Sequence, residues 1–240
     1  MVTTWNKETA ALVEVLGLEK KPVAITFTND EPDVPRPKSK YLCRAIKQAA
    51  DGRSFLIDME CSGCKGGSFH CGLTPPPQGK ARRTLQEFLT SGERLTASIV
   101  SFLRMEELGS PPPTGLSDRI FLGPMEEAPI RPDLALFLCD AEQACRILVL
   151  DNFWDGVPQQ PQVSGSMCHS AIAYPLVTGN TNVTFGDWTA RRVQKYDRHT
   201  VFVTIPYERM ANLVRAIPEC SAGDATAEMP PEFLPSPDDD

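Results

Sequence analysis

The stretch Pro22-Val-Ala-Ile-Thr-Phe27 is short, apolar and rich in β-branched residues, and these properties predict a buried β-strand. Residues 7–16 before it carry apolar side chains at helical spacing, and Gly17 follows where a helix-ending glycine is expected. Helical and strand-like segments continue to alternate as far as about residue 217. The sequence therefore predicts an α/β (α+β) fold.

The second half of the chain repeats this order faintly. Pro132-Asp-Leu-Ala-Leu-Phe137 matches the first strand, and Cys168-His-Ser-Ala-Ile172 matches Cys43-Arg-Ala-Ile46. A third match joins residues 98–105 to residues 202–210, and a strand is expected at 97–102. Such matches predict an internal duplication, although short βα units resemble one another in any α/β chain.

The duplication would divide the chain into three parts. We expect one α/β lobe at residues 1–115, including a Cys-rich loop at 60–80, and a similar lobe at residues 116–218. An acidic, Pro-rich tail follows at 219–240. The two lobes would face each other about an approximate two-fold axis.

The charges are unevenly distributed along the chain. Its 240 residues hold 24 Lys and Arg against 31 Asp and Glu, a net charge of −7. Residues 221–240 hold six of the acids and no base, so the remainder is close to −1. Because phosphate binding needs a basic footprint, we expect no nucleic-acid binding.

Targeting signals are not evident in the sequence. No apolar stretch approaches the roughly 18–20 residues of a membrane span, so we expect no membrane insertion. The N-terminal residues lack the basic and apolar regions of a secretory signal, which favours a cytoplasmic protein.

Cysteine is the strongest compositional signal. In a reducing compartment structural disulfides are rare, so a group of cysteines points to metal binding or catalysis. Cys139 ends an apolar strand and Cys145 lies in an apolar helix, so both are expected to be small core residues, and Cys220 is expected to be free. The remaining five are Cys43, Cys61, Cys64, Cys71 and Cys168.

Three of these five lie in the glycine-rich loop at residues 60–80. The spacing Cys61-x-x-Cys64 brings two thiolates within reach of one metal or cluster, and Cys71 follows after six intervening residues. The loop has few apolar residues, so burial alone would not offset the entropy lost on ordering it. We expect a bound cofactor to order the loop.

An iron–sulfur cluster fits the wide spacing of the cysteines, since such clusters accept thiolates from scattered positions. The expected cofactor is a [4Fe-4S] cluster held between the two lobes by Cys43, Cys64 and Cys168, with Cys61 or Cys71 as the fourth ligand. Two alternatives remain open: zinc bound by the Cys-x-x-Cys pair with His70 and Cys71, and thiol redox chemistry without a metal.

Four further residues are candidates for catalysis or substrate binding. His70 and His169 each adjoin a proposed ligand, so either could hydrogen-bond to the cofactor or transfer a proton. Arg191 and Arg192 could bind a small anionic substrate through charge-assisted hydrogen bonds. For each of the four, an ordinary surface position is the alternative.

Several of these residues give the chain a resemblance to a known family. Cys43, Cys64-Lys-Gly-Gly67, Cys168 and Val203-Thr-Ile-Pro-Tyr-Glu-Arg-Met210 resemble the domain of unknown function 169 family, over about residues 8–218. That family has a late Cys before a small-residue–Arg pair, whereas here Thr189-Ala190-Arg191-Arg192 lacks it and Cys168 lies earlier. The resemblance implies this fold, iron–sulfur binding and a setting in anaerobic metabolism.

These observations favour an iron–sulfur redox protein or enzyme. Two other functions remain open. The first is a non-catalytic subunit or assembly factor, or a homo-oligomer, that binds its partner through the tail at residues 221–240. The second is a structural zinc protein.

Overall fold

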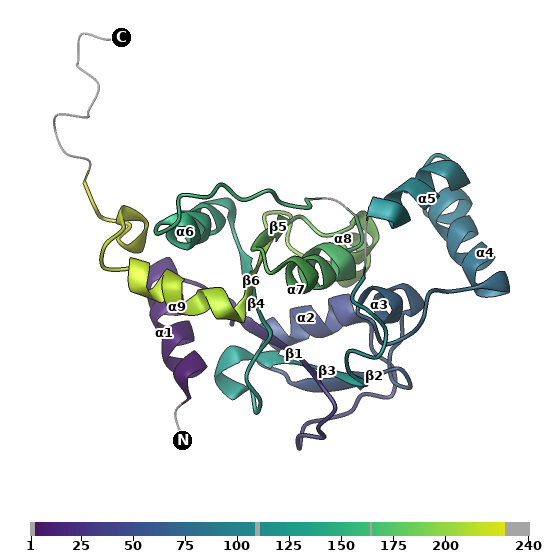
Figure 1. Cartoon of the computed structure of the whole chain (residues 1–240), viewed down its shortest axis with the longest axis horizontal. Coiled ribbons are helices and arrows are strands. Elements are labelled where there is room, and N and C mark those ends of the chain that lie inside the picture. Colours follow the sequence, from purple (N-terminus) through teal and green to yellow (C-terminus); the bar gives the residue numbers. More distant parts are fainter. Residues whose placement is uncertain (1–2, 109–110, 164, 229–240) are drawn as a thin grey trace, which may run out of the picture.

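The computed structural model describes residues 3–108, 111–163 and 165–228, which form a sheet between two layers of helices (Figure 1). Among these residues the strands make one six-stranded sheet, antiparallel throughout. The strand order is β2 (Phe55–Asp58), β3 (Arg119–Pro124), β1 (Val23–Thr28), β4 (Leu134–Cys139), β6 (Val201–Pro206) and β5 (Asn182–Thr184). The predicted mixed α/β class is confirmed.

The first three strands occupy one half of the sheet, and the last three occupy the other half in mirrored order. Strands β1 and β4 meet at the centre, where Ala24 lies opposite Ala135. On either side the next pairing also corresponds, because Pro124 of β3 and Pro206 of β6 end their strands in equivalent registers against β1 and β4. Both halves therefore build one continuous sheet.

One of the three sequence matches behind the expected duplication is wrong. Residues 98–105, expected to include a strand, belong mostly to the helix α5 (Ile99–Leu108). The place that corresponds to β6 is taken by β3, whose Arg119-Ile-Phe-Leu-Gly-Pro124 ends in proline as β6 does. The run at 97–102 is rich in apolar residues but has no neighbouring strand to pair with.

Helices cover both faces of the sheet. We call one helical layer the thiol layer; it contains α2 (Leu42–Ala50), α3 (Lys65–His70), the π-helix η3 (His169–Ala173), α7 (Tyr174–Thr178) and α8 (Trp188–Gln194). The opposite layer contains α1 (Thr4–Leu16), α6 (Ala141–Asn152) and α9 (Tyr207–Ala216). Along β4, Leu134 and Leu136 pack toward the thiol layer, and Ala135 and Phe137 pack toward the opposite one.

Local sequence signals set the ends of several elements. Helix α1 ends at Gly17, whose left-handed φ of 59° is the conformation that glycine adopts without strain. Helix α6 begins with a capping box between Asp140 and Gln143. Cys139 is buried, as predicted, whereas Cys145 is exposed on α6, so the prediction that it belongs to the core is wrong.

The glycine-rich segment at residues 60–80 contains regular structure that the sequence did not predict. Cys64 caps a short helix, α3 (Lys65–His70), by accepting a hydrogen bond from the N–H of Gly67. Beyond it, α4 (Gly79–Glu87), the π-helix η1 (Phe88–Gly92) and α5 project away from the sheet (Figure 1). We call residues 79–108 the helical arm.

The chain packs against the fold beyond residue 219, where the tail was expected to begin. Cys220 is buried, and the 3-10 turns η2 (Met125–Glu127) and η4 (Ser221–Gly223) pack against α1 and α6 respectively. Arg146 of α6 donates a hydrogen bond to the carbonyl of Ala222. Residues 229–240, most of the expected partner-binding segment, lie outside the described residues. Within the described ranges no helix has the length and apolar character to cross a membrane.

Candidate functional site

Four cysteines from three separate segments converge in the thiol layer. The thiols of Cys71 and Cys168 are joined by a hydrogen bond. The charge of Cys168 acts on both Cys43 and Cys64, and Cys64 acts on Cys43. We call Cys43, Cys64, Cys71 and Cys168 the thiol cluster.

Each cysteine is delivered by a different structural device. Cys43 lies in the first turn of α2, Cys64 and Cys71 cap the two ends of α3, and Cys168 directly precedes η3. Gly67 allows these segments to approach closely, because a Cβ added there would lie 3.3 Å from Sγ of Cys168 and 3.6 Å from Cβ of Cys64. The absence of a side chain at Gly67 therefore lets α3 pack closely against Cys168.

The electrostatic environment of the cluster disfavours free thiolates. Burial raises the pKa of Cys43 and of Cys64, and neighbouring thiols and Asp187 add to the rise. The hydrogen bond that the Cys168 thiol donates to Cys71, followed by burial, raises the pKa of Cys168 well above its usual value. At neutral pH all three thiols stay protonated unless something replaces the proton.

Backbone N–H groups point at the same sulfur atoms. The N–H of Gly67 donates to Sγ of Cys64 at 3.3 Å, and the N–H of Gly66 also lowers the pKa of this thiol. The N–H of Arg44 lowers the pKa of Cys43 in the same way. Such donors stabilise a bound thiolate and are one of the means by which proteins tune thiolate-bound clusters.

Cys61 does not join the cluster. Its Sγ accepts a hydrogen bond from the N–H of Asp58 at 3.3 Å, and its own N–H donates to Asp58 Oδ1 at 3.0 Å. These bonds hold Cys61 in the turn after β2, where Arg36 pairs with Asp58. Of the two expected fourth ligands, the structure therefore brings Cys71 and not Cys61 to the other thiols.

Two histidines lie beside the cluster, as their positions next to Cys71 and Cys168 require. The rings of His70 and His169 are 5.8 Å apart between centroids. Burial lowers the pKa of His70 to about 4, and the charge of His169 contributes to this shift. Nδ1 of His70 is buried and has no hydrogen-bond partner among the described residues. His70 is therefore neutral at neutral pH.

The two arginines proposed for anion binding have different surroundings. The guanidinium of Arg191 donates to the carbonyls of four residues, Phe185, Asp197, Arg198 and Thr200, and so fixes the loop that follows α8. Arg192 pairs with Glu93 of the helical arm at 2.7 Å. Arg191 is thus committed to structure, and Arg192 ties the arm to α8.

Two residues of the site were not assigned to it from the sequence. Tyr196 donates a hydrogen bond from its hydroxyl to the carbonyl of Cys43, and its ring packs edge-on against Phe202 at 5.0 Å. Asp187 caps α8 through the N–H of Ala190 at 2.6 Å, and its other carboxylate oxygen accepts from the N–H of Met167. Tyr196 carried no motif that could have identified it.

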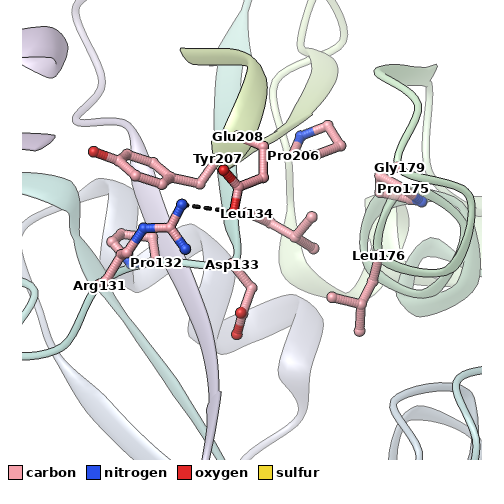
Figure 2. A pocket seen from close by; sticks show the side chains of 10 residues that line it. All are labelled: Arg131, Pro132, Asp133, Leu134, Pro175, Leu176, Gly179, Pro206, Tyr207 and Glu208. Atoms are coloured by element: carbon pink, nitrogen blue, oxygen red, sulfur yellow. Dashed lines mark hydrogen bonds and ion pairs between the residues drawn. The ribbon is translucent and has the colours of Figure 1, made fainter. Parts of the chain in front are cut away.

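Two surface pockets lie away from the cluster. The smaller, of about 210 Å³, is shown in Figure 2; Arg131 lies over the ring of Tyr207 and pairs with Glu208 at its rim. The larger, of about 440 Å³, is lined by Arg36, Asp58 and residues near them. Neither pocket is lined by a thiol-cluster cysteine.

The described part of the chain contains no group of three or more His, Cys, Asp or Glu side chains arranged to hold a single metal ion. All eight cysteines are free thiols. The four cysteines of the thiol cluster therefore lie together without a disulfide.

Comparison with known proteins gives the relatives of the chain. A model of the domain of unknown function 169 family, described as uncharacterised ArCR, matches residues 11–216. Uncharacterized protein MJ0308 of Methanocaldococcus jannaschii is 23% identical over 219 residues, which cover 86% of this chain and 90% of that protein. No solved structure matches the chain. The region matched by the family includes all four thiol-cluster cysteines, and neither description states a cofactor or an activity.

Proposed function

The chain belongs to the domain of unknown function 169 family, and we propose that it binds an iron–sulfur cluster of the [4Fe-4S] type and functions in redox chemistry. The ligands would be Cys43, Cys64, Cys71 and Cys168. The observation that carries the proposal is the convergence of these four free thiols from α2, both ends of α3 and the start of η3. When bound, such a cluster takes up and releases single electrons.

The chemistry of the thiols supports a metal-bound state over thiol catalysis. A reactive cysteine needs a lowered pKa, because the thiolate is the nucleophile. Here burial raises the pKa of Cys43 and Cys64. A bound metal would take the place of the proton on each sulfur, and the N–H groups of Arg44, Gly66 and Gly67 would stabilise the thiolates.

We favour a four-iron cluster over zinc because iron–sulfur clusters accept thiolates from scattered positions along a chain. Among the described residues no group of three or more His, Cys, Asp or Glu is placed to hold a metal ion. Zinc remains the alternative that metal analysis distinguishes.

Metal and sulfide analysis after anaerobic purification tests the proposal. We expect about four iron atoms and four acid-labile sulfides per chain, together with an electron paramagnetic resonance signal after reduction by dithionite. Zinc without sulfide would replace the proposal with a structural zinc site. The absence of iron, sulfide and zinc from anaerobic protein would refute metal binding.

Alanine variants assign the ligands. Cys43→Ala, Cys64→Ala and Cys71→Ala should each reduce the iron content strongly. Cys61→Ala should retain it, because Cys61 bonds to Asp58 and not to the cluster. Cys145→Ala, on the surface of α6, is the matched control for loss of a thiol. Equal iron retention in all five variants, with unchanged circular dichroism, would show that the thiol cluster is not the site.

A further inference from the structure

We propose that the surface formed by α2, the start of α3 and α8 docks an acidic protein electron carrier above the thiol cluster. The redox role of this docking rests on the proposed iron–sulfur function, but the docking itself follows from charge and shape. We call Arg44, Lys47, Lys65, Arg192 and Lys195 the basic face.

The basic face is continuous across two helices. The ammonium group of Lys47 on α2 donates to the carbonyls of Gln194 and Lys195, at 2.8 and 2.7 Å, at the end of α8. Helices α2 and α8 lie side by side in Figure 1, with α3 next to them. Arg44 directly follows Cys43, and Lys65 directly follows Cys64. The bases thus surround the two ligand-bearing positions.

Positive charge is concentrated here against the trend of the chain. The five side chains of the basic face carry a formal charge of +5. The whole chain is −7, so all the other residues together carry −12. A local excess of this size on an acidic protein creates a positive patch that attracts an acidic surface.

Most of this charge is not neutralised within the chain. No carboxylate of the described residues forms an ion pair with Arg44, Lys47, Lys65 or Lys195. Arg192 pairs with Glu93 but remains 55% exposed. By contrast, Lys20 and Arg131 elsewhere on the surface have carboxylate partners. The basic face is therefore available to an external anion.

Exposed apolar side chains lie among the bases. Tyr41, next to the start of α2, is 48% exposed, and Trp188, the first residue of α8, is 63% exposed. Phe185 and Val193, which lie within five residues of Trp188 in the sequence, are also exposed. Aromatic side chains combined with arginine are typical of protein interfaces. Neither surface pocket includes these residues, so a broad partner fits better than a small anion.

The orientation of the cluster agrees with transfer through this face. Cys43 and Cys64 are partly exposed, whereas Cys71 and Cys168 are buried. Cys43 and Cys64 are therefore the cluster members nearest to solvent, and each is followed along the chain by an exposed base, Arg44 or Lys65. One electron would pass from the reduced carrier to the cluster, oxidising the carrier and reducing the cluster, with no atom transferred.

The acidic segment of the same chain begins elsewhere. Its first described residues, including η4, pack against α6 in the opposite layer, far from α8 in Figure 1. A separate acidic molecule therefore approaches the basic face more readily than this segment does. Occupation by the tail of a second copy is an outcome that the experiment below distinguishes.

Stopped-flow reduction of the anaerobic protein by a small, acidic [2Fe-2S] ferredoxin tests the proposal. We expect the rate to fall steeply with added salt, and to fall about tenfold at low ionic strength in the double variant R44E/K195E. K7E/R215E, on α1 and α9, changes the net charge equally and should leave the rate within about twofold. Iron and sulfide content and reduction by dithionite should match the wild type in both variants.

Equal rates for the two double variants, or no dependence on salt, would overturn the docking proposal. If the protein contains no iron, calorimetric binding of oxidised ferredoxin still decides: salt-sensitive binding weakened by R44E/K195E supports docking while the cluster proposal fails. Binding of inorganic phosphate but not of ferredoxin would replace the carrier with a small anion. Salt-sensitive dimers that disappear on removal of residues 229–240 would assign the face to a second copy's tail.

Discussion

Cysteines lie in both helical layers, but their surroundings differ. Cys139, packed with the opposite layer, has a pKa raised to about 12, chiefly by burial, and its thiol contacts the carbonyl of Val201. Cys168 is also buried, but its strongest interaction is with the thiol of Cys71, and two further thiols lie within electrostatic reach. Burial therefore explains the raised pKa of Cys139. The convergence of three other thiols on Cys168 requires another explanation.

Removing one sulfur from each layer gives the largest expected contrast. Cys168→Ala should abolish most of the iron binding, because it removes the one thiol that interacts with all three other members of the thiol cluster. Cys139→Ala should keep the full iron content and cost roughly 1 kcal/mol of unfolding free energy through a small cavity. Iron analysis and urea unfolding of both variants check this. Equal iron loss in the two would remove the distinction between the layers.

Adding one methyl group to α3 tests how tightly the thiol layer is packed. At Gly67 a Cβ would lie 3.2 Å from Leu42 and 3.3 Å from Sγ of Cys168, so Gly67→Ala should cost roughly 1–3 kcal/mol and lower iron retention. At Gly66 the nearest atom, Sγ of Cys64, is 4.0 Å away. Gly66→Ala should therefore be neutral or stabilise by up to about 1 kcal/mol, since alanine favours helix.

Denaturant unfolding of the two alanine variants measures this difference directly. If Gly66→Ala proves as costly as Gly67→Ala, close packing against Cys168 is not the reason for the glycine at position 67.

The hydroxyl of Tyr196 offers a smaller test of the same packing. It donates to the carbonyl of Cys43 inside the thiol layer, so Tyr196→Phe should cost about 1 kcal/mol. Tyr174 donates to the carbonyl of Gln160 at an exposed position, so Tyr174→Phe should change stability by less than about 0.5 kcal/mol. Thermal unfolding of both variants compares them, and a larger effect at Tyr174 would contradict this ranking.

The smallest expected effect lies at the seam between the two halves of the sheet. Asp133 accepts a hydrogen bond from the N–H of Phe27 at 2.7 Å, yet burial raises the pKa of its carboxyl. The folded state therefore holds this proton more tightly than the unfolded state, so its contribution favours folding at low pH and is lost as the pH rises through the folded pKa. Asp133→Asn should flatten this dependence and slightly stabilise the protein at pH 7.

Unfolding free energies of wild type and Asp133→Asn, measured from pH 4 to pH 7, check this prediction. A variant that loses stability relative to wild type as the pH rises would show that the carboxylate is favoured by the folded state.

Much of the fold could be predicted because the sheet is covered on both faces. Strands such as β1 and β4 are then continuous apolar runs, which the sequence displays directly. The run at residues 97–102 has the same appearance but forms part of α5, because the helical arm lies away from the sheet and offers no strand partner. Local composition does not show which apolar runs have a neighbouring strand to pair with.

The sequence predicted that cysteines form the site, but it did not predict fully which cysteines and which other residues belong to it. Cysteine content and glycine spacing indicated the segment, and Cys43, Cys64 and Cys168 were expected together. The Cys61-x-x-Cys64 spacing suggested a pair, but Asp58 binds Cys61 through two hydrogen bonds after β2. The role of Tyr196 depends on a contact 153 residues away along the chain, which no local pattern encodes.

The separation of the thiols along the chain has a consequence for synthesis. Cys43 and Cys168 are 125 positions apart, and each lies in the half of the chain that builds a different half of the sheet. At about 5–20 residues per second, a ribosome adds Cys168 on the order of ten seconds after Cys43. Until then Cys43, Cys64 and Cys71 form an incomplete set, so a nascent chain loaded early would have to hold its inorganic centre with three sulfurs.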